Sequence, residues 1–233
     1  MRYNDPKPHI RLRFHSESSE DLLLIYNQLS NYIVELQEMN IIHELEINTY
    51  FPEVNRYGGP VLIDKAEHLF YEDSLVTMEL LELMSKNNLS KEQVGVISLL
   101  HYLNDFGLNF ESQLSFLKIN LKNYTTYRKQ FKDEEFDFVK ELDSYNNWRN
   151  LERIDLKKII RILERKSDSV KIYSQCIKKN EELTNDFANI IGSIIHMHFN
   201  RLFEIDRDFE DKLYVYAYQT LYGQRVLRKL QTV

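Results

Sequence analysis

The sequence predicts an α+β fold in which a small N-terminal β-sheet is followed by a large, predominantly helical portion. Two observations carry this prediction. Near the N-terminus apolar and polar side chains alternate, whereas further along the chain apolar side chains recur every three to four residues. All four prolines lie within the first 60 residues, so residues 61–233 can form long, uninterrupted helices.

The composition is that of a globular protein. The chain has 233 residues, 43% hydrophobic and 28% charged, which is enough to form a core and excludes intrinsic disorder. No apolar stretch approaches the roughly 18 residues of a membrane span, and no signal peptide opens the sequence. Cys176 is the single cysteine and cannot form an internal disulfide, which favours a reducing, cytoplasmic location. No linker-like composition divides residues 1–233, so we expect one domain.

The first quarter is expected to run strand, helix, strand, loop. Ile10, Leu12 and Phe14 alternate with polar residues, which is typical of a strand. Ser18 or Ser19 can cap the helix that follows. A strand needs a neighbour and residues 1–8 are short for one, so we expect another strand or a chain extending upstream of Met1. The expected ranges are strands 9–15 and 43–51, a helix 20–39 and a loop 52–60.

The remainder is expected to be helical. Breaks are expected at Asn87–Asn88, Gly107, 122–132 and Asn146–Asn147. Ser90 with Gln93 resembles a capping box, which marks a helix start. The expected helices cover 64–86, 90–105, 111–122, 133–145, 155–180, 184–203 and 207–230.

Charge is unevenly distributed along the chain. Residues 118–179 hold 16 Lys and Arg against 10 Asp and Glu, although the whole chain carries a net charge of −6. A basic segment can attract nucleic acid or an acidic partner. Here acidic residues are interleaved with the bases, which favours a solvated helical surface, and we expect no direct nucleic-acid binding.

Two arginines in the first predicted strand form the first candidate site. Arg11 and Arg13 are two residues apart and therefore share one face, flanked by His9 and His15. Two guanidinium groups about 6–7 Å apart along a strand can hold carboxylate or phosphate oxygens. A polar strand face that meets only water remains the alternative from this segment alone.

The loop PEVNRYGGP is the second candidate. Glu53 can orient Arg56 or take part in acid–base chemistry, and Gly58–Gly59 permits a tight turn or close approach of the backbone to a ligand. A structural turn with a surface ion pair is the alternative.

The segment GSIIHMHFNRLF carries the third candidate site. On a helix His196 and His198 lie about 200° apart and cannot both bind one metal, and we expect no metal or cofactor. His196 shares a stripe with Gly192 and Asn200, and the small residues Gly192 and Ser193 beside it allow close approach by another group. A histidine with a purely structural role is the alternative. Nucleotide-binding, zinc-protease and serine-hydrolase motifs are absent.

Three segments in order give the chain a family resemblance. PKPHIRLRF, then TYFPEVNRYGG leading into AEHLFYEDS, then IIHMHFNRLF resemble the C-terminal elimination domain of lantibiotic dehydratases, a domain shared with thiopeptide-type bacteriocin biosynthesis proteins. The resemblance spans nearly the whole chain. The large glutamylation domain of such enzymes is not part of it, so we expect a domain clipped at its N-terminal strand, a split partner or a degenerate remnant.

The resemblance implies a lyase reaction. Full enzymes of this kind esterify Ser or Thr of a precursor peptide with glutamate from glutamyl-tRNA, and the C-terminal domain then eliminates glutamate to leave dehydroalanine or dehydrobutyrine. By the resemblance, the site residues are Arg11, Arg13, Glu53, Arg56 and His196. We expect His196, Arg13 and Arg56 to carry the catalysis, with Arg11 and Glu53 helping to bind the substrate. Arginine suits the leaving glutamyl group, which carries a further carboxylate, and His196 can move a proton near neutral pH.

Two other functions fit the same resemblance. One is the thiopeptide-type cycloaddition enzyme built on this fold, which has no glutamate to expel. The other is a docking subunit without catalysis. The expected partners are a glutamylated precursor peptide and a separate glutamylating protein or domain, and a cyclase, a second copy of this chain or a membrane-associated synthetase complex remain open.

Overall fold

The computed structural model describes residues 2–4, 7–16, 18–87, 89–142, 144, 148–149 and 151–231. Two compact units can be distinguished among them, one formed by residues 1–9 with 53–233 and the other by residues 10–52. That residues 1–233 act as one domain stays a prediction.

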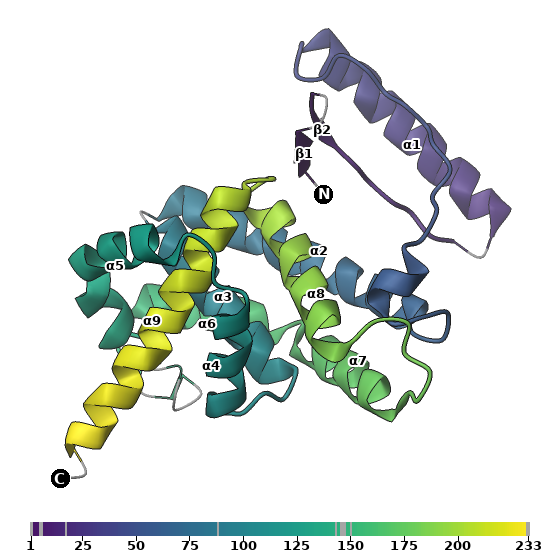
Figure 1. The fold of residues 1–233 in the computed structure, drawn as a ribbon. Coiled ribbons are helices and arrows are strands. Elements are labelled where there is room, and N and C mark those ends of the chain that lie inside the picture. Colours follow the sequence, from purple (N-terminus) through teal and green to yellow (C-terminus); the bar gives the residue numbers. More distant parts are fainter. Residues whose placement is uncertain are drawn as a thin grey trace. The chain divides into compact units, whose positions relative to one another are not determined.

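The first unit is a helical bundle, and Figure 1 labels its strand β1 and its helices α2 to α9. Within the described residues, no helix is both long and apolar enough to cross a bilayer. The elements are strand β1 (Arg2–Asn4), the 3-10 helix η1 (Val54–Tyr57) and helices α2 (Ile63–Lys86), α3 (Lys91–Asp105), α4 (Phe110–Ile119), α5 (Tyr124–Val139), α6 (Ile154–Glu164), α7 (Ser167–Lys179), α8 (Phe187–Leu202) and α9 (Arg207–Gln231).

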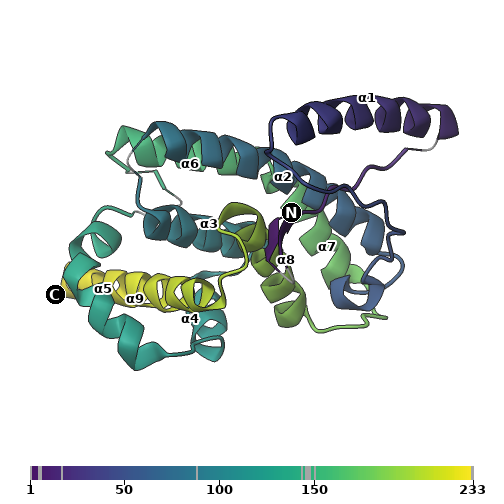
Figure 2. The ribbon, with the colours of Figure 1, turned by 90° about the horizontal axis from the view of Figure 1, so that it is seen from above.

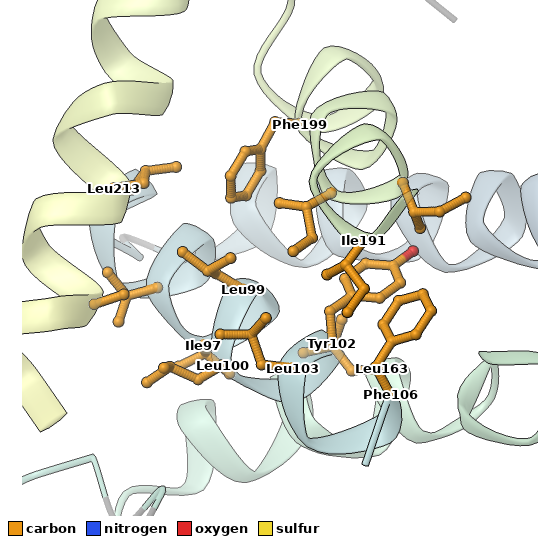
Figure 3. Close-up of a cluster of buried hydrophobic side chains, with 14 of the residues drawn as sticks. Ile97, Leu99, Leu100, Tyr102, Leu103, Phe106, Leu163, Ile191, Phe199 and Leu213 are labelled. Atoms are coloured by element: carbon orange, nitrogen blue, oxygen red, sulfur yellow. The ribbon is translucent and has the colours of Figure 1, made fainter. Parts of the chain in front are cut away.

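Helix α3 lies at the centre of this unit, where it packs against α4, α6, α7, α8 and α9 (Figure 2). Twelve of its 15 residues are buried, because helices surround it on all sides. Figure 3 shows Leu99 of α3 in one cluster with Phe199 of α8 and Leu213 of α9. At Gly95 a Cβ atom would come within 2.6 Å of the Leu213 side chain, so glycine there permits the close approach of α9.

Several helix boundaries follow from local sequence, as predicted. The Ser18 and Ser90 side chains accept hydrogen bonds from the backbone N–H groups of Asp21 and Gln93, at the starts of α1 and α3. Gly107, at φ +77°, ends α3. The expected helices 20–39, 64–86, 90–105, 111–122, 184–203 and 207–230 are confirmed to within three residues at each end.

Two other helix predictions were wrong. Instead of 133–145, α5 covers Tyr124–Val139, because contacts with α9 stabilise the segment that we expected to be a break. One of these contacts is a hydrogen bond from the Gln219 amide to the Tyr124 hydroxyl. The expected helix 155–180 is divided into α6 and α7 at Arg165–Lys166, where the Lys166 side chain turns into the core. The break expected at Asn146–Asn147 lies outside the described residues.

The predicted N-terminal β-sheet, with strands at 9–15 and 43–51, is not shown, and the described chain is mostly helical. The strands within it are the three-residue β1 and β2 (Pro8–Ile10), which pair with each other, whereas residues 11–16 and 42–53 contain no strand. Alternation gives a segment one apolar face, but a sheet also requires a neighbouring strand and a layer that covers that face. Within residues 10–52 no such layer forms, and Leu12 and Ile47 are 59% and 71% exposed.

The second unit is built on helix α1 (Ser19–Glu38). No residue of this helix is buried, even though its apolar side chains recur at helical spacing. Residues 10–16 and 42–52 complete the unit as extended chain.

Candidate functional site

The loop 52–60 presents a glutamate and an arginine side by side. The Arg56 guanidinium donates to both carboxylate oxygens of Glu53, at 3.2 and 3.3 Å, because the turn of η1 brings residues three apart together. The two side chains remain 32% and 58% exposed, so a ligand can reach them. Gly58 and Gly59, at φ +95° and +113°, take the chain out of η1 in a conformation that favours glycine.

Three hydrogen bonds hold the backbone of this loop. The carbonyl oxygens of Asn55, Arg56 and Tyr57 accept bonds from Thr184 Oγ1 at 2.9 Å, Asn185 Nδ2 at 3.1 Å and Tyr173 Oη at 2.8 Å. A 3-10 helix of four residues leaves its last carbonyls without partners, and these side chains supply them. The backbone of Arg56 is therefore fixed against α7 and the segment before α8, whereas its side chain stays accessible.

His196 lies on α8, where it contacts the first turn of α9. Its Nδ1 is 2.7 Å from Glu210 Oε2 and its Nε2 is 2.9 Å from Asn200 Nδ2. The stripe expected on this helix is confirmed by the bond to Asn200, one turn later. One turn earlier, a Cβ atom at Gly192 would meet no atom of the described residues within 4 Å, so Gly192 faces open space among them.

His198 lies on another face of the same helix and is fully buried. Asp73 of α2 binds its ring, with Nδ1 to Oδ1 at 2.7 Å. The same carboxylate accepts bonds from Tyr102 Oη at 2.7 Å, Lys166 Nζ at 2.7 Å and Arg201 NH1 at 3.0 Å. We call these five residues the Asp73 network. It joins α2, α3, α8 and the turn between α6 and α7 at the centre of the bundle.

Burial sets the charges of this network. It lowers the pKa of His198 to about 4, so that the ring is neutral near pH 7, and lowers the pKa of Lys166 to about 8. Burial opposes ionisation of Asp73 as well, yet His198, Lys166 and Arg201 hold its pKa well below the usual value. The network is therefore a buried carboxylate matched by cations, an arrangement that stabilises the bundle only while it is complete.

Arg11 and Arg13 belong to the unit of residues 10–52, and both are exposed. The Arg13 guanidinium lies over the ring of Tyr50, 4.3 Å from its centroid, as a cation–π pair. Glu53, Arg56 and His196 belong to the helical unit. There Glu53 and Arg56 are paired, but no hydrogen bond or ion pair joins either one to His196 in the described structure. That all five residues form one site stays a prediction.

Sequence reasoning did not identify Glu210 or the Asp73 network. Asp73 follows Leu69 by four residues and precedes Leu80 by seven, so a lone carboxylate stood on a face expected to be buried. A carboxylate on an apolar helix face was the signal that could have indicated buried polar partners for Asp73. Glu210 is 14 residues from His196 across the turn between α8 and α9, and no periodicity relates the two.

Comparison with known proteins identifies the class. The family model described as lantibiotic biosynthesis dehydratase C-term matches residues 1–221, and the chain belongs to that family. It is 38% identical over 229 residues to the subtilin biosynthesis protein SpaB of Bacillus subtilis, covering 97% of this chain and 22% of SpaB. It is 30% identical over 226 residues to the nisin biosynthesis protein NisB of Lactococcus lactis subsp. lactis, covering 95% of this chain and 22% of NisB.

A solved structure shows the same fold. The tRNA-dependent lantibiotic dehydratase MibB from Microbispora sp. 107891 matches 99% of this chain with 25% of its own, at a TM-score of 0.80 and 20% identity. The chain thus spans about a fifth to a quarter of the length of these relatives.

Proposed function

We propose that this chain eliminates glutamate from glutamylated Ser or Thr residues of a ribosomal precursor peptide, leaving dehydroalanine or dehydrobutyrine. The observation that carries the proposal is the match of the dehydratase C-terminal family over residues 1–221. The relatives are named as lantibiotic biosynthesis proteins, which is consistent with a peptide substrate. The paired, accessible Glu53 and Arg56 and the histidine beside open space supply chemistry that such a reaction needs.

In this proposal Arg56 binds the glutamyl group. A guanidinium group matches a carboxylate in two parallel hydrogen bonds, and the substrate carries a carboxylate besides its ester. Glu53 holds the Arg56 side chain in place until the substrate arrives, and the anchored backbone keeps the pair in position. Arg13 is a second ligand for the leaving group, with Arg11 in a supporting role.

His196 would move the proton. A base takes the Cα hydrogen of the esterified residue, the electron pair forms the Cα–Cβ double bond, the Cβ–O bond breaks, and glutamate leaves as a carboxylate. Charge builds on the leaving oxygens as that bond breaks, and a positioned arginine stabilises it. A neutral imidazole is a suitable base near neutral pH.

The proposed function implies a separate source of glutamylated peptide. Because the chain spans 22% of SpaB and of NisB, we propose that another domain or protein attaches the glutamate and binds the precursor. The elimination step itself requires only the esterified peptide, so it can be tested on this chain alone.

The test is to supply the purified chain with a synthetic peptide that carries a glutamyl ester on one Ser, and to follow its mass. Loss of glutamate with formation of dehydroalanine supports the proposal, whereas peptide binding without turnover, or ring formation, contradicts it. Arg56→Ala and His196→Ala should accumulate uneliminated ester. Arg225→Ala is the matched control, because Arg225 forms an exposed pair with Glu111 elsewhere on the bundle. Full elimination by both Arg56→Ala and His196→Ala would contradict the roles proposed for these two residues.

A further inference from the structure

We propose that Glu210 and Asn200 are positioning residues that hold the His196 ring with its proton on Nδ1, so that Nε2 is the atom that takes the peptide proton. This inference rests on the proposed function, but the protonation of the ring can be measured without any reaction. It assigns a role to two residues that the family resemblance did not supply.

The first step is the contact at Nδ1. This nitrogen lies 2.7 Å from Glu210 Oε2, and both side chains are largely enclosed, at 10% and 12% exposure. An ionised carboxylate only accepts hydrogen bonds, so the hydrogen must be on Nδ1. A carboxylate behind the ring also stabilises the imidazolium that forms when Nε2 takes a proton, which is how such a pair assists a general base.

The second step is the contact at Nε2. In a neutral imidazole with its hydrogen on Nδ1, Nε2 carries a lone pair, and the Asn200 amide can donate to it at 2.9 Å. The two contacts therefore agree on one tautomer. After Nε2 has taken the proton and the amide has returned to the ring, its oxygen can accept from Nε2, so Asn200 can bind the ring before and after proton transfer.

Arg207 completes the surroundings of the pair. Its NH1 is 3.3 Å from Glu210 Oε2 and 3.0 Å from His196 Nδ1, and its side chain is 66% exposed. Nδ1 cannot both donate to Glu210 and accept from Arg207, and in the proposed tautomer Arg207 donates to the carboxylate. Being exposed, Arg207 contributes less to the position of the ring than Glu210 does.

Glu210 and the first turn of α9 occupy the Nδ1 side of the ring. On the Nε2 side the ring meets the amide of Asn200, a residue that is 4% exposed. The atom that can meet a substrate is therefore Nε2, after the Asn200 amide has been displaced. This choice of atom answers which nitrogen acts as the base in the proposed elimination.

The tautomer can be observed directly by long-range 1H–15N NMR of the chain, with the His196 signals assigned by comparison with His196→Gln. We expect the Nδ1–H form in the parent and a mixture with Nε2–H in Glu210→Gln, because a glutamine side chain can either accept from Nδ1 or donate to it. Asn200→Asp should place hydrogens on both nitrogens at neutral pH, because carboxylates would then face both. An Nε2–H ring in the parent, or an unchanged ring in both variants, would overturn the proposal.

Kinetic measurements distinguish the positioning role of Glu210 from the proposed elimination activity. For glutamate release from the esterified peptide, we expect Glu210→Gln to lower kcat roughly 10–100-fold with KM nearly unchanged, the usual size of an effect transmitted through a neighbouring residue. Glu92→Gln is the matched control, since Glu92 joins α3 to α9 through Lys212 at 2.8 Å and does not touch His196. If the parent releases no glutamate but its tautomer is lost in Glu210→Gln, the proposed function fails and the positioning stands. Equal kcat in parent and Glu210→Gln would refute the positioning role.

Discussion

The surroundings of His196 and of His198 differ although both side chains leave the same helix two residues apart. His198 is completely enclosed and bound to Asp73, among cations and aromatic rings from four parts of the bundle. His196 is 8% exposed, Glu210 and Asn200 bind its two nitrogens, and one turn earlier on the helix Gly192 faces open space. Both histidines have a carboxylate beside Nδ1, so the contact at Nδ1 alone does not distinguish their roles.

Accessibility and the remaining partners make the distinction. In the Asp73 network the ring of His198 is completely buried, so it cannot exchange a proton with a substrate unless the bundle opens. At His196 the second nitrogen is bound to one amide side chain, and the His196 side chain keeps 10% of its surface exposed. We infer that the first arrangement stabilises the fold and that the second is suited to chemistry. Each prediction below tests one side of this comparison.

The largest expected effect is on catalysis. His196→Gln should reduce glutamate elimination about 100- to 10,000-fold, the range typical for loss of a general base, with a small change in stability. His198→Gln should instead lower the free energy of unfolding by about 1–3 kcal/mol through loss of a buried ring and its bond to Asp73, while the folded fraction keeps its kcat. Urea unfolding and single-turnover elimination on both variants measure the two effects. A reversed pattern would show that the roles of the two histidines have been exchanged.

The second prediction concerns the carboxylate of the network. Asp73→Asn removes the charge that faces Lys166 and Arg201, leaving both cations buried without their counter-ion. We expect the free energy of unfolding to fall by about 3–5 kcal/mol, the usual cost of breaking a buried pair from one side.

Its control is Glu111→Gln, which breaks the exposed pair with Arg225 at 3.4 Å. Exposed pairs contribute about 0–1 kcal/mol, so urea unfolding should separate the two variants clearly. Similar stability of the two would mean that the Asp73 network does not hold the bundle together.

The third prediction is a pH dependence of stability. The unfolded chain binds a proton at His198 near its ordinary pKa of 6.5, whereas in the folded chain burial lowers that pKa to about 4. Between these values the unfolded state carries more protons, so stability falls as the pH falls. The full effect approaches roughly 3 kcal/mol.

Urea unfolding at several pH values between 7 and 4 measures this slope. His198→Gln should flatten it, whereas His68→Gln, which changes an exposed histidine on α2, should not. An unchanged slope in His198→Gln would contradict a neutral, buried His198 in the folded chain.

Local signals predicted more of this structure than long-range ones could. Helix starts at Ser18 and Ser90 follow from side-chain caps within three residues, and the Glu53–Arg56 pair follows from spacing along one turn. The start of α5 depends instead on contacts with α9. The alternating segments 11–15 and 43–51 form no strand, because a strand also needs a neighbouring strand, which an alternating pattern does not reveal. The partner of His196 was not predictable, because Glu210 reaches it only through the turn between α8 and α9.

The smallest expected effect concerns the backbone of the loop that carries Arg56. Asn185→Ala removes the amide that donates to the Arg56 carbonyl at 3.1 Å, in a half-buried position. Loss of one such bond lowers the free energy of unfolding by about 1 kcal/mol. Because the Arg56 side chain is proposed to bind the glutamyl group, we also expect KM for the esterified peptide to rise a few-fold with kcat less affected.

Asn87→Ala is the matched control for this last effect. The Asn87 amide donates to the Leu83 carbonyl at 2.8 Å at the end of α2, so its loss is comparable in stability but does not involve the loop. Steady-state elimination kinetics on both variants separate a bond that positions the loop from one that only stabilises a helix end. If KM changes equally in both, the anchoring of the loop has no part in substrate binding, and only the exposed Glu53–Arg56 pair would remain as the feature that positions Arg56.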